Sequence, residues 1–181
     1  MNWLIPILQV TVIATCVNDP YRITKPAKLK HVKSIVKYAE LNNQDPYELL
    51  AIAITESNLN PKAVSSAGAI GLFQVMCKFW YKRQGYISIK QCNKELVKPE
   101  KNIKAGVDIL TTMRRKYKQC KGDLAYRCYF AGPGWRKYKP EGKTAKSIIR
   151  YEKKVRERRL KLPKYYSDLI KDIRASIKKR S

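Results

Sequence analysis

Apolar residues recur every three or four positions along most of this 181-residue chain, a spacing that places them on one face of an α-helix. Such stripes occupy residues 32–39, 72–79, 103–117, 144–162 and 166–177, and a short helix is indicated over 123–128. Residues 86–90 (YISIK) form the one segment that reads as a short strand. The pattern therefore predicts a mainly α fold, in which the last two stripes form two successive helices.

A helix-start signal precedes a further apolar stretch. Asp45 is the expected N-cap, Pro46 takes the first helical position and Glu48 follows three residues after the cap. Pro61 disfavours helical backbone in the residue before it. The helix is therefore predicted to begin near Asp45 and to end before Pro61.

A carboxylate extends the apolar face of this predicted helix. Glu56 follows Ile52 and Ala53 by four and three residues, so the three side chains share one side. Partial burial and the negative end of the helix dipole both disfavour the ionised form, so both should raise the pKa of Glu56. A glutamic acid that keeps its proton near neutral pH is a candidate general acid. Spacing alone, however, favours a surface glutamate near a frayed helix end.

Basic residues greatly outnumber acidic ones. The chain has 39 Lys+Arg against 14 Asp+Glu, a formal net charge of +25. This excess points to a polyanionic partner, for which nucleic acid, acidic wall polymer and anionic lipid are the candidates. No metal-finger spacing or ribonucleoprotein-type motif is present, so no nucleic-acid partner is expected. The length suits one compact domain with additional segments at its ends.

The N-terminal stretch is uncharged and apolar. Residues 3–17 (WLIPILQVTVIATCV) have the length of a secretory signal core and are short for a bilayer span. We therefore predict that residues 1–18 are a signal peptide, or an N-terminal hydrophobic anchor if they are retained, and a docking helix stays open. Export would bring the protein to the periplasm or cell wall, and a place in a phage virion is the other location considered.

Removal of that segment would leave an even number of cysteines. They are Cys77, Cys92, Cys120 and Cys128. Three pairings are open to them in an oxidising compartment, and the local one joins the first two and the last two. Four reduced cysteines, packed as small apolar side chains, are the alternative. Since no C-x-x-C spacing occurs and His31 is the only histidine, we expect no metal, and no organic cofactor is needed.

Small residues gather in the segment SSAGAIGLFQV, residues 65–75. Its glycines let the backbone turn closely before a helix that is predicted to open at Gly71. Such a loop can approach a ligand without side-chain obstruction. Gln74 would present an amide that can donate to a sugar and accept from it.

Four blocks stand in order along the chain, namely Glu56-Ser57, Ser65 to Gln74, Asn102 to Gly106 and Tyr129 to Gly132. In that order and at those separations, they resemble the signature of the SLT-type lytic transglycosylases of the lysozyme superfamily. The resemblance covers roughly residues 30–155. It favours a catalytic role for Glu56 over the surface glutamate that spacing alone favours. Two positions depart from the pattern, because Phe73 stands where methionine is commoner and Phe130 replaces the usual asparagine of the last block.

The resemblance implies that Glu56 is the single catalytic acid and base. Its target would be the bond between N-acetylmuramic acid and N-acetylglucosamine, with a 1,6-anhydro product. The implied substrate-binding residues are Ser57, Ser65, Gly71, Gln74, Tyr126, Tyr129 and Gly132. Tyr129 is expected to restrain Glu56 through a hydroxyl contact. Tyr126 and Trp135 are expected to offer stacking faces to sugar rings.

The implied organisation is a lysozyme-like transglycosylase domain over residues 27–157, followed by a basic C-terminal helix over 158–181. The expected partners of this monomeric enzyme are peptidoglycan glycan strands and an anionic cell-wall or outer-membrane surface, together with a secretion, conjugation or phage virion assembly. Two alternatives stay open. One is a hydrolytic lysozyme of the same fold, and the other is a non-catalytic module that binds cell wall or nucleic acid.

Overall fold

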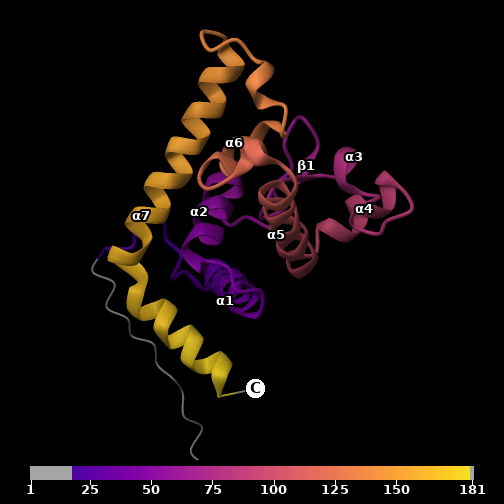
Figure 1. Cartoon of the computed structure of the whole chain (residues 1–181). Helices are drawn as coiled ribbons and strands as arrows, with labels where there is room; N and C mark the ends of the chain where they lie inside the picture. The colour runs from indigo at the N-terminus through magenta and orange to yellow at the C-terminus, as the bar shows by residue number, and fades with distance from the viewer. Residues whose placement is uncertain (1–17, 180–181) are drawn as a thin grey trace, which may run out of the picture.

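The computed structural model describes residues 18–179 and is built mainly of α-helices, as predicted (Figure 1). The elements run α1 (Pro26–Leu41), α2 (Pro46–Ser57), β1 (Ala69–Ile70), β2 (Val75–Met76), α3 (Cys77–Trp80), α4 (Ile89–Leu96), α5 (Pro99–Lys116), η1 (Lys118–Cys120), α6 (Leu124–Ala131), η2 (Trp135–Lys137) and α7 (Lys143–Lys178). The predicted signal or anchor segment lies outside the described residues, apart from residue 18. Within 18–179, no helix is both long enough and apolar enough to cross a bilayer.

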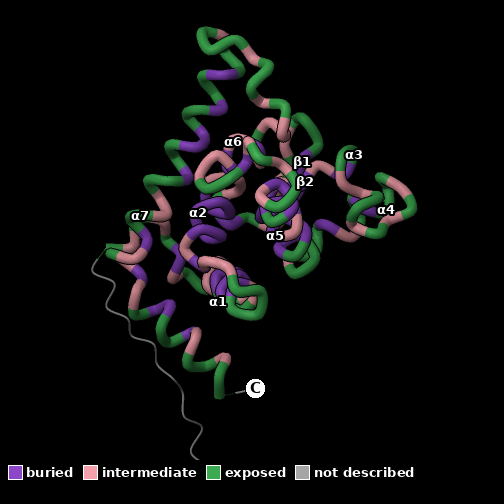
Figure 2. The backbone as a smooth tube through the Cα atoms, in the orientation of Figure 1, coloured by how far each residue is buried: buried purple, intermediate pink, exposed green. Residues whose placement is uncertain are grey.

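Helix α2 forms the centre of the molecule. Residues 48–54 are all buried, and α2 packs against both α1 and α7 (Figure 2). Its start is as predicted, since the Asp45 side chain accepts a hydrogen bond of 2.9 Å from the Tyr47 amide. Its end is set by Asn58, which adopts a left-handed conformation with φ of 51°. Both boundaries predicted from the sequence are thus confirmed, and Glu56 lies in the last turn.

The predicted helix over residues 72–79 is wrong. Residues 69–76 form a short antiparallel hairpin in which Ala69 pairs with Met76, and α3 begins only at Cys77. The backbone makes this turn because Gly71 and Gln74 have φ angles of +76° and +46°, which no α-helix tolerates. Phe79, counted in the helical stripe, is 69% exposed.

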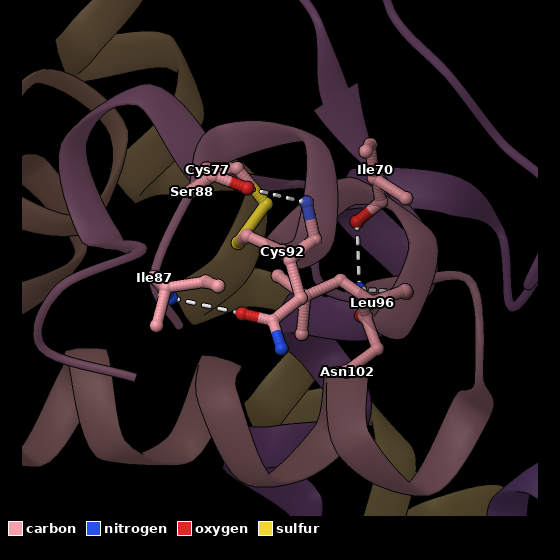
Figure 3. Close-up of a disulfide and its surroundings, with 8 residues drawn as sticks. Ile70, Cys77, Ile87, Ser88, Cys92, Leu96 and Asn102 are labelled. Carbon is pink, nitrogen blue, oxygen red and sulfur yellow. Dashed lines mark hydrogen bonds between the residues drawn. A yellow bond between two sulfur atoms is a disulfide. The ribbon is translucent and has the colours of Figure 1, made fainter. Parts of the chain in front are cut away.

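The predicted strand over residues 86–90 is also wrong, because the segment caps and begins α4. The Ser88 hydroxyl oxygen accepts from the Gln91 amide at 3.1 Å, and the Gln91 side-chain oxygen accepts from the Ile87 amide at 2.8 Å (Figure 3). These two bonds satisfy backbone donors at the helix start, as in a capping box. Apolar alternation over five residues gave no information on this local hydrogen bonding.

The two helices predicted after residue 143 form one continuous helix, α7, so the predicted break between them is wrong. Pro163 lies inside it and removes one backbone donor. The helix continues because its apolar stripe packs against α1 beyond the proline, where Leu169, Ile170 and Ile173 are buried. Figure 1 shows α7 running along one side of the molecule past α6, α2 and α1. The predicted domain boundary at 157/158 falls within this helix.

The cysteines form the local pairing among the predicted alternatives. Cys77 is bonded to Cys92, which joins α3 to α4 (Figure 3), and Cys120 is bonded to Cys128, which joins η1 to α6. All four side chains are buried. The first bridge therefore closes the small α3–α4 lobe, and the second fixes the segment that leads into α6.

Candidate active site

Glu56 lies at the wall of a cleft of about 680 Å³. The cleft is lined by Pro20, Tyr21, Ile54, Thr55, Glu56, Ser57, Asn58, Ala63, Val64, Gln74, Lys154 and Arg158. These residues come from the N-terminal segment, the end of α2, the hairpin region and α7. Among these lining residues, Glu56 is the one carboxylic acid.

The environment of Glu56 favours its protonated form. Burial raises the pKa of Glu56 from 4.5 to about 7, and a hydrogen bond from Tyr151 opposes part of this rise. The Tyr151 hydroxyl donates to Oε1 of Glu56 over 2.6 Å. At neutral pH the carboxyl group is therefore divided between an acid that can give a proton and a base that can take one back, as general acid–base catalysis requires.

The hydroxyl that restrains Glu56 belongs to Tyr151, so the contact predicted for Tyr129 is wrong. Tyr129 instead donates to the carbonyl of Phe73 over 2.8 Å. Burial and the charge of Glu56 raise the pKa of both tyrosines well above 10, so both remain hydrogen-bond donors. Tyr151 lies 95 residues from Glu56 in the sequence and belongs to none of the four blocks, so the resemblance gave no signal for it.

Two predicted substrate-binding residues line the cleft and also hold its wall in place. The Ser57 hydroxyl contacts the carbonyls of Leu72 and Ala53 at 2.9 and 3.2 Å, which joins α2 to the hairpin. The Gln74 amide nitrogen donates to the carbonyls of Ala63 and Gly71 at 3.1 and 3.0 Å. Their side-chain oxygens can accept further hydrogen bonds from a ligand in the cleft.

Three other predicted site residues lie outside the cleft lining and shape the backbone. The Ser65 hydroxyl oxygen accepts from the Ala69 amide at 3.0 Å and closes the turn before β1. Gly132 ends α6 with φ of +80°, a conformation that favours glycine. Gly71, also left-handed, lies so close to Asn102 that a Cβ atom would stand 2.4 Å from its side-chain nitrogen.

Asn102 holds the hairpin in this conformation, a role that reasoning from the sequence missed. Its side chain is 1% exposed, accepts from the Phe73 amide at 2.8 Å and donates to the carbonyls of Ile70 and Leu96 at 2.8 and 3.0 Å. Figure 3 shows the bond to Ile70 beside the α3–α4 lobe. The position of Asn102 at the head of the third block was the available signal.

Tyr126 cannot offer a stacking face to a sugar, so that prediction is wrong. The side chain is fully buried, and its hydroxyl donates to Glu48 over 2.5 Å. Trp135 is half-buried, with the guanidinium carbons of Arg127 and Arg136 at 4.7 and 5.4 Å from its ring centre. It does not line the cleft. Reasoning from the sequence could not distinguish buried from exposed aromatic residues on either side of the last block.

Phe130, which replaces the usual asparagine, packs against the ring of Tyr151. Its ring stacks on that of Tyr151, with centroids 4.8 Å apart and an interplanar angle of 29°. Phe130 is still 47% exposed. It therefore covers one face of the residue that donates to Glu56.

Replacing Tyr151 with phenylalanine is expected to raise the pKa of Glu56 above its value of about 7. The variant removes the hydrogen bond that favours the carboxylate and leaves the burial that disfavours it. Carboxyl-carbon NMR titration measures the shift. Tyr129→Phe is the matched control, because its hydroxyl bonds to a carbonyl instead. A fall in the pKa in Tyr151→Phe, or an equal rise in both variants, would contradict this assignment.

Within the described part of the chain, no three His, Cys, Asp or Glu side chains come together in a group suited to a metal ion. Glu56 can transfer a proton in this cleft, and its polar neighbours can form hydrogen bonds with a ligand.

Comparison with known proteins gives the family. The sequence model of the transglycosylase SLT domain matches residues 33–151. Two curated relatives, both named membrane-bound lytic murein transglycosylase C and from Histophilus somni strains 2336 and 129Pt, are each 37% identical over 92 residues. The match covers 49% of this chain and 25% of each relative, so the chain spans about a quarter of their length.

Solved structures share the fold. The 70 kDa soluble lytic transglycosylase of Escherichia coli aligns with a TM-score of 0.57 and 24% identity, over 74% of this chain and 24% of that one. An inactive mutant of lytic transglycosylase Slt from Pseudomonas aeruginosa aligns with a TM-score of 0.59 and 22% identity, over 82% of this chain and 25% of that one. The predicted lysozyme-like fold is confirmed. Because the family match spans most of the chain and includes Glu56, the chain belongs to the transglycosylase SLT domain family.

Proposed function

We propose that this protein is a peptidoglycan lytic transglycosylase that cleaves the β-1,4 bond between N-acetylmuramic acid and N-acetylglucosamine. The observation that carries the proposal is Glu56, a carboxyl group with a pKa of about 7 and the one carboxylic acid in the described lining of the cleft. Most glycosidases place two carboxyl groups around the scissile bond. A cleft with one suits a reaction in which the substrate supplies its own nucleophile.

The proposed reaction uses the Glu56 proton twice. The acid first gives its proton to the glycosidic oxygen, and the bond from that oxygen to C1 of the muramyl residue breaks. The resulting carboxylate then takes the proton of the C6 hydroxyl of the same residue, and O6 bonds to C1 to close a 1,6-anhydro ring. The leaving sugar carries away the first proton, Glu56 recovers the second, and no water is consumed. The N-acetyl group can stabilise the positive charge at C1.

Tyr151 supports the first half of this cycle. Its hydroxyl remains protonated and donates to Glu56 over 2.6 Å, so it stabilises the carboxylate that forms after the first proton transfer. Ser57 and Gln74 lie in the same cleft, where their oxygens can accept from sugar hydroxyl and amide groups. The names of the relatives and of the structural neighbours, all lytic transglycosylases, support the same reaction.

The test is the mass of the products from purified murein. A transglycosylase yields 1,6-anhydromuramyl fragments, each lighter by one water than the fragment released by a hydrolytic lysozyme. Mass spectrometry of the digest is expected to show the anhydro series. A digest containing only reducing-end fragments would make the protein a lysozyme of the same fold, and no cleavage at all would leave a wall-binding module.

The charge of the chain suits an anionic cell envelope. A net charge of +25 would concentrate the protein at acidic wall polymers or lipopolysaccharide in a manner that weakens with added salt. Export to the periplasm or wall follows from the proposed substrate, and both curated relatives are named as membrane-bound. Local wall opening for a secretion, conjugation or phage assembly is the biological setting we propose.

A further inference from the structure

Two basic side chains of α7 line the same cleft as Glu56. Lys154 and Arg158 are four residues apart, so they project from one face of the helix on successive turns. The ion pairs of residues 18–179 include neither of them. The next residue, Arg159, shows the contrast, since it pairs with Asp45 and Asp123. The cleft therefore holds two positive charges that no carboxylate of the described chain pairs with.

Arg158 is held in position and is only half-exposed. Its Nη1 donates to the Thr55 hydroxyl oxygen over 2.7 Å, and the Thr55 hydroxyl in turn donates to the Ala51 carbonyl over 2.7 Å. Its guanidinium carbon lies 5.7 Å from the ring centre of Tyr21. Burial lowers the pKa of Arg158, so the charge has already lost part of its hydration. A guanidinium has five N–H donors, so hydrogen bonds to Thr55 and Tyr21 leave further donors for a ligand.

We propose that Lys154 and Arg158 form a subsite for carboxylates carried by the muramyl residue of the substrate. This inference rests on the proposed function. The sugars of a murein strand are otherwise neutral, and their acidic groups hang from the lactyl arm of N-acetylmuramic acid, as the carboxylates of the peptide stem or, where the peptide has been removed, as the lactyl carboxylate itself. Thr55 precedes Glu56 in α2, so the Arg158 charge is held next to the residue that would cleave the bond of that same sugar.

The chemistry of the two side chains fits this ligand. A guanidinium binds a carboxylate through two parallel N–H donors, and an ammonium adds a mobile second charge. A guanidinium already ordered by Thr55 loses little rotamer freedom on binding. The subsite would thus place the muramyl residue, rather than N-acetylglucosamine, on the side of the scissile bond where its C6 hydroxyl can reach C1.

The experiment compares three glycan substrates that differ in their acidic groups. They are strands with peptide stems, strands stripped by an amidase, which keep the lactyl carboxylate, and stripped strands whose lactyl carboxylates have been converted to methylamides. Arg158→Gln is expected to raise KM by about tenfold, and Lys154→Gln by a few-fold, on carboxylate-bearing strands, with little change in kcat. On the neutral strands both variants should match the parent. A KM effect confined to the peptide-bearing strands identifies the stem as the source, and an effect on stripped strands identifies the lactyl group.

Controls separate this subsite from general charge and from folding. Arg156→Gln removes the same charge from an exposed position on the same helix that does not line the cleft. An equal rise in KM for Arg156→Gln, or an equal rise on the neutral strands, would overturn the proposal. Lys154 is exposed and has no ion-pair partner among residues 18–179, so its variant keeps the test available if Arg158→Gln melts early.

Binding can be measured without turnover in the Glu56→Gln background. Calorimetry with peptide-bearing strands is expected to show a Kd about tenfold weaker when Arg158→Gln is added. This readout distinguishes the two failures. A parent protein that binds strands through Arg158 but cleaves none contradicts the proposed function, whereas one that cleaves strands with no dependence on either cation contradicts the subsite.

Discussion

Glu56→Gln is expected to abolish glycan cleavage, with kcat falling about a thousandfold or more. The amide keeps the size of the side chain and can still contact the Tyr151 hydroxyl, yet it has no proton to give to the glycosidic oxygen and no carboxylate to take one from the C6 hydroxyl. Release of 1,6-anhydro fragments from purified murein measures the loss. Cleavage at the parental rate by this variant would remove Glu56 from the mechanism.

The same substitution is expected to stabilise the fold at high pH. The folded pKa of Glu56, about 7, lies above its ordinary value of 4.5, so the bound proton contributes stability in full below about pH 4.5, and that stability is lost as the pH rises through 7. The amide of the Glu56→Gln variant carries no charge to bury. Between about pH 4.5 and 7, the free energy of unfolding of the parent should therefore fall by about 3 kcal/mol relative to that of the variant.

Urea unfolding at pH 4 and pH 8 measures this difference. The two proteins should be close in stability at the lower pH, and the variant should be the more stable one at the higher pH. A variant with the same pH profile as the parent would mean that Glu56 is ionised and solvated in the folded protein. Together, lost cleavage and raised stability would distinguish an active-site acid from a structural glutamate.

Glu48→Ala is expected to destabilise the fold by about 4 kcal/mol. Glu48 is 2% exposed and accepts from both terminal nitrogens of Arg114, at 2.7 and 2.5 Å, and from the Tyr126 hydroxyl. Removing the Glu48 carboxylate leaves the Arg114 guanidinium and the Tyr126 hydroxyl without the acceptor that they share. These contacts join α2 to α5 and α6, so the loss should appear in global unfolding by urea.

Glu157→Ala is the matched control, because Glu157 is half-exposed and faces Lys153 over 4.0 Å at the surface. Its removal should change stability by less than about 0.5 kcal/mol. If both alanine variants unfold at the same urea concentration as the parent, the buried network contributes no net stability. Glu48→Gln, which keeps an acceptor for Arg114, should lie between parent and alanine.

The start signal of α2 shows what local sequence information can predict and what it cannot. Asp45 and Pro46 start α2 as predicted, because their effect needs only the backbone next to them. From the sequence, Glu48 is expected to belong to that same start signal. In the structure it is buried against α5 and α6, whose partner residues lie 66 and 78 positions further along the chain.

The sequence by itself determined the helical fold, both ends of α2, the place of Glu56 on an apolar face and, through four spaced blocks, the family. The helices, the ends of α2 and the face that carries Glu56 depend on residues a few positions apart, where helix geometry fixes which side chains are neighbours. Only the tertiary structure decided the hairpin at 69–76, whose left-handed residues are held by Asn102, and the donor to Glu56, which Tyr151 supplies from α7. Contacts between residues 29 and 95 positions apart depend on how whole helices pack, and no local periodicity encodes that packing.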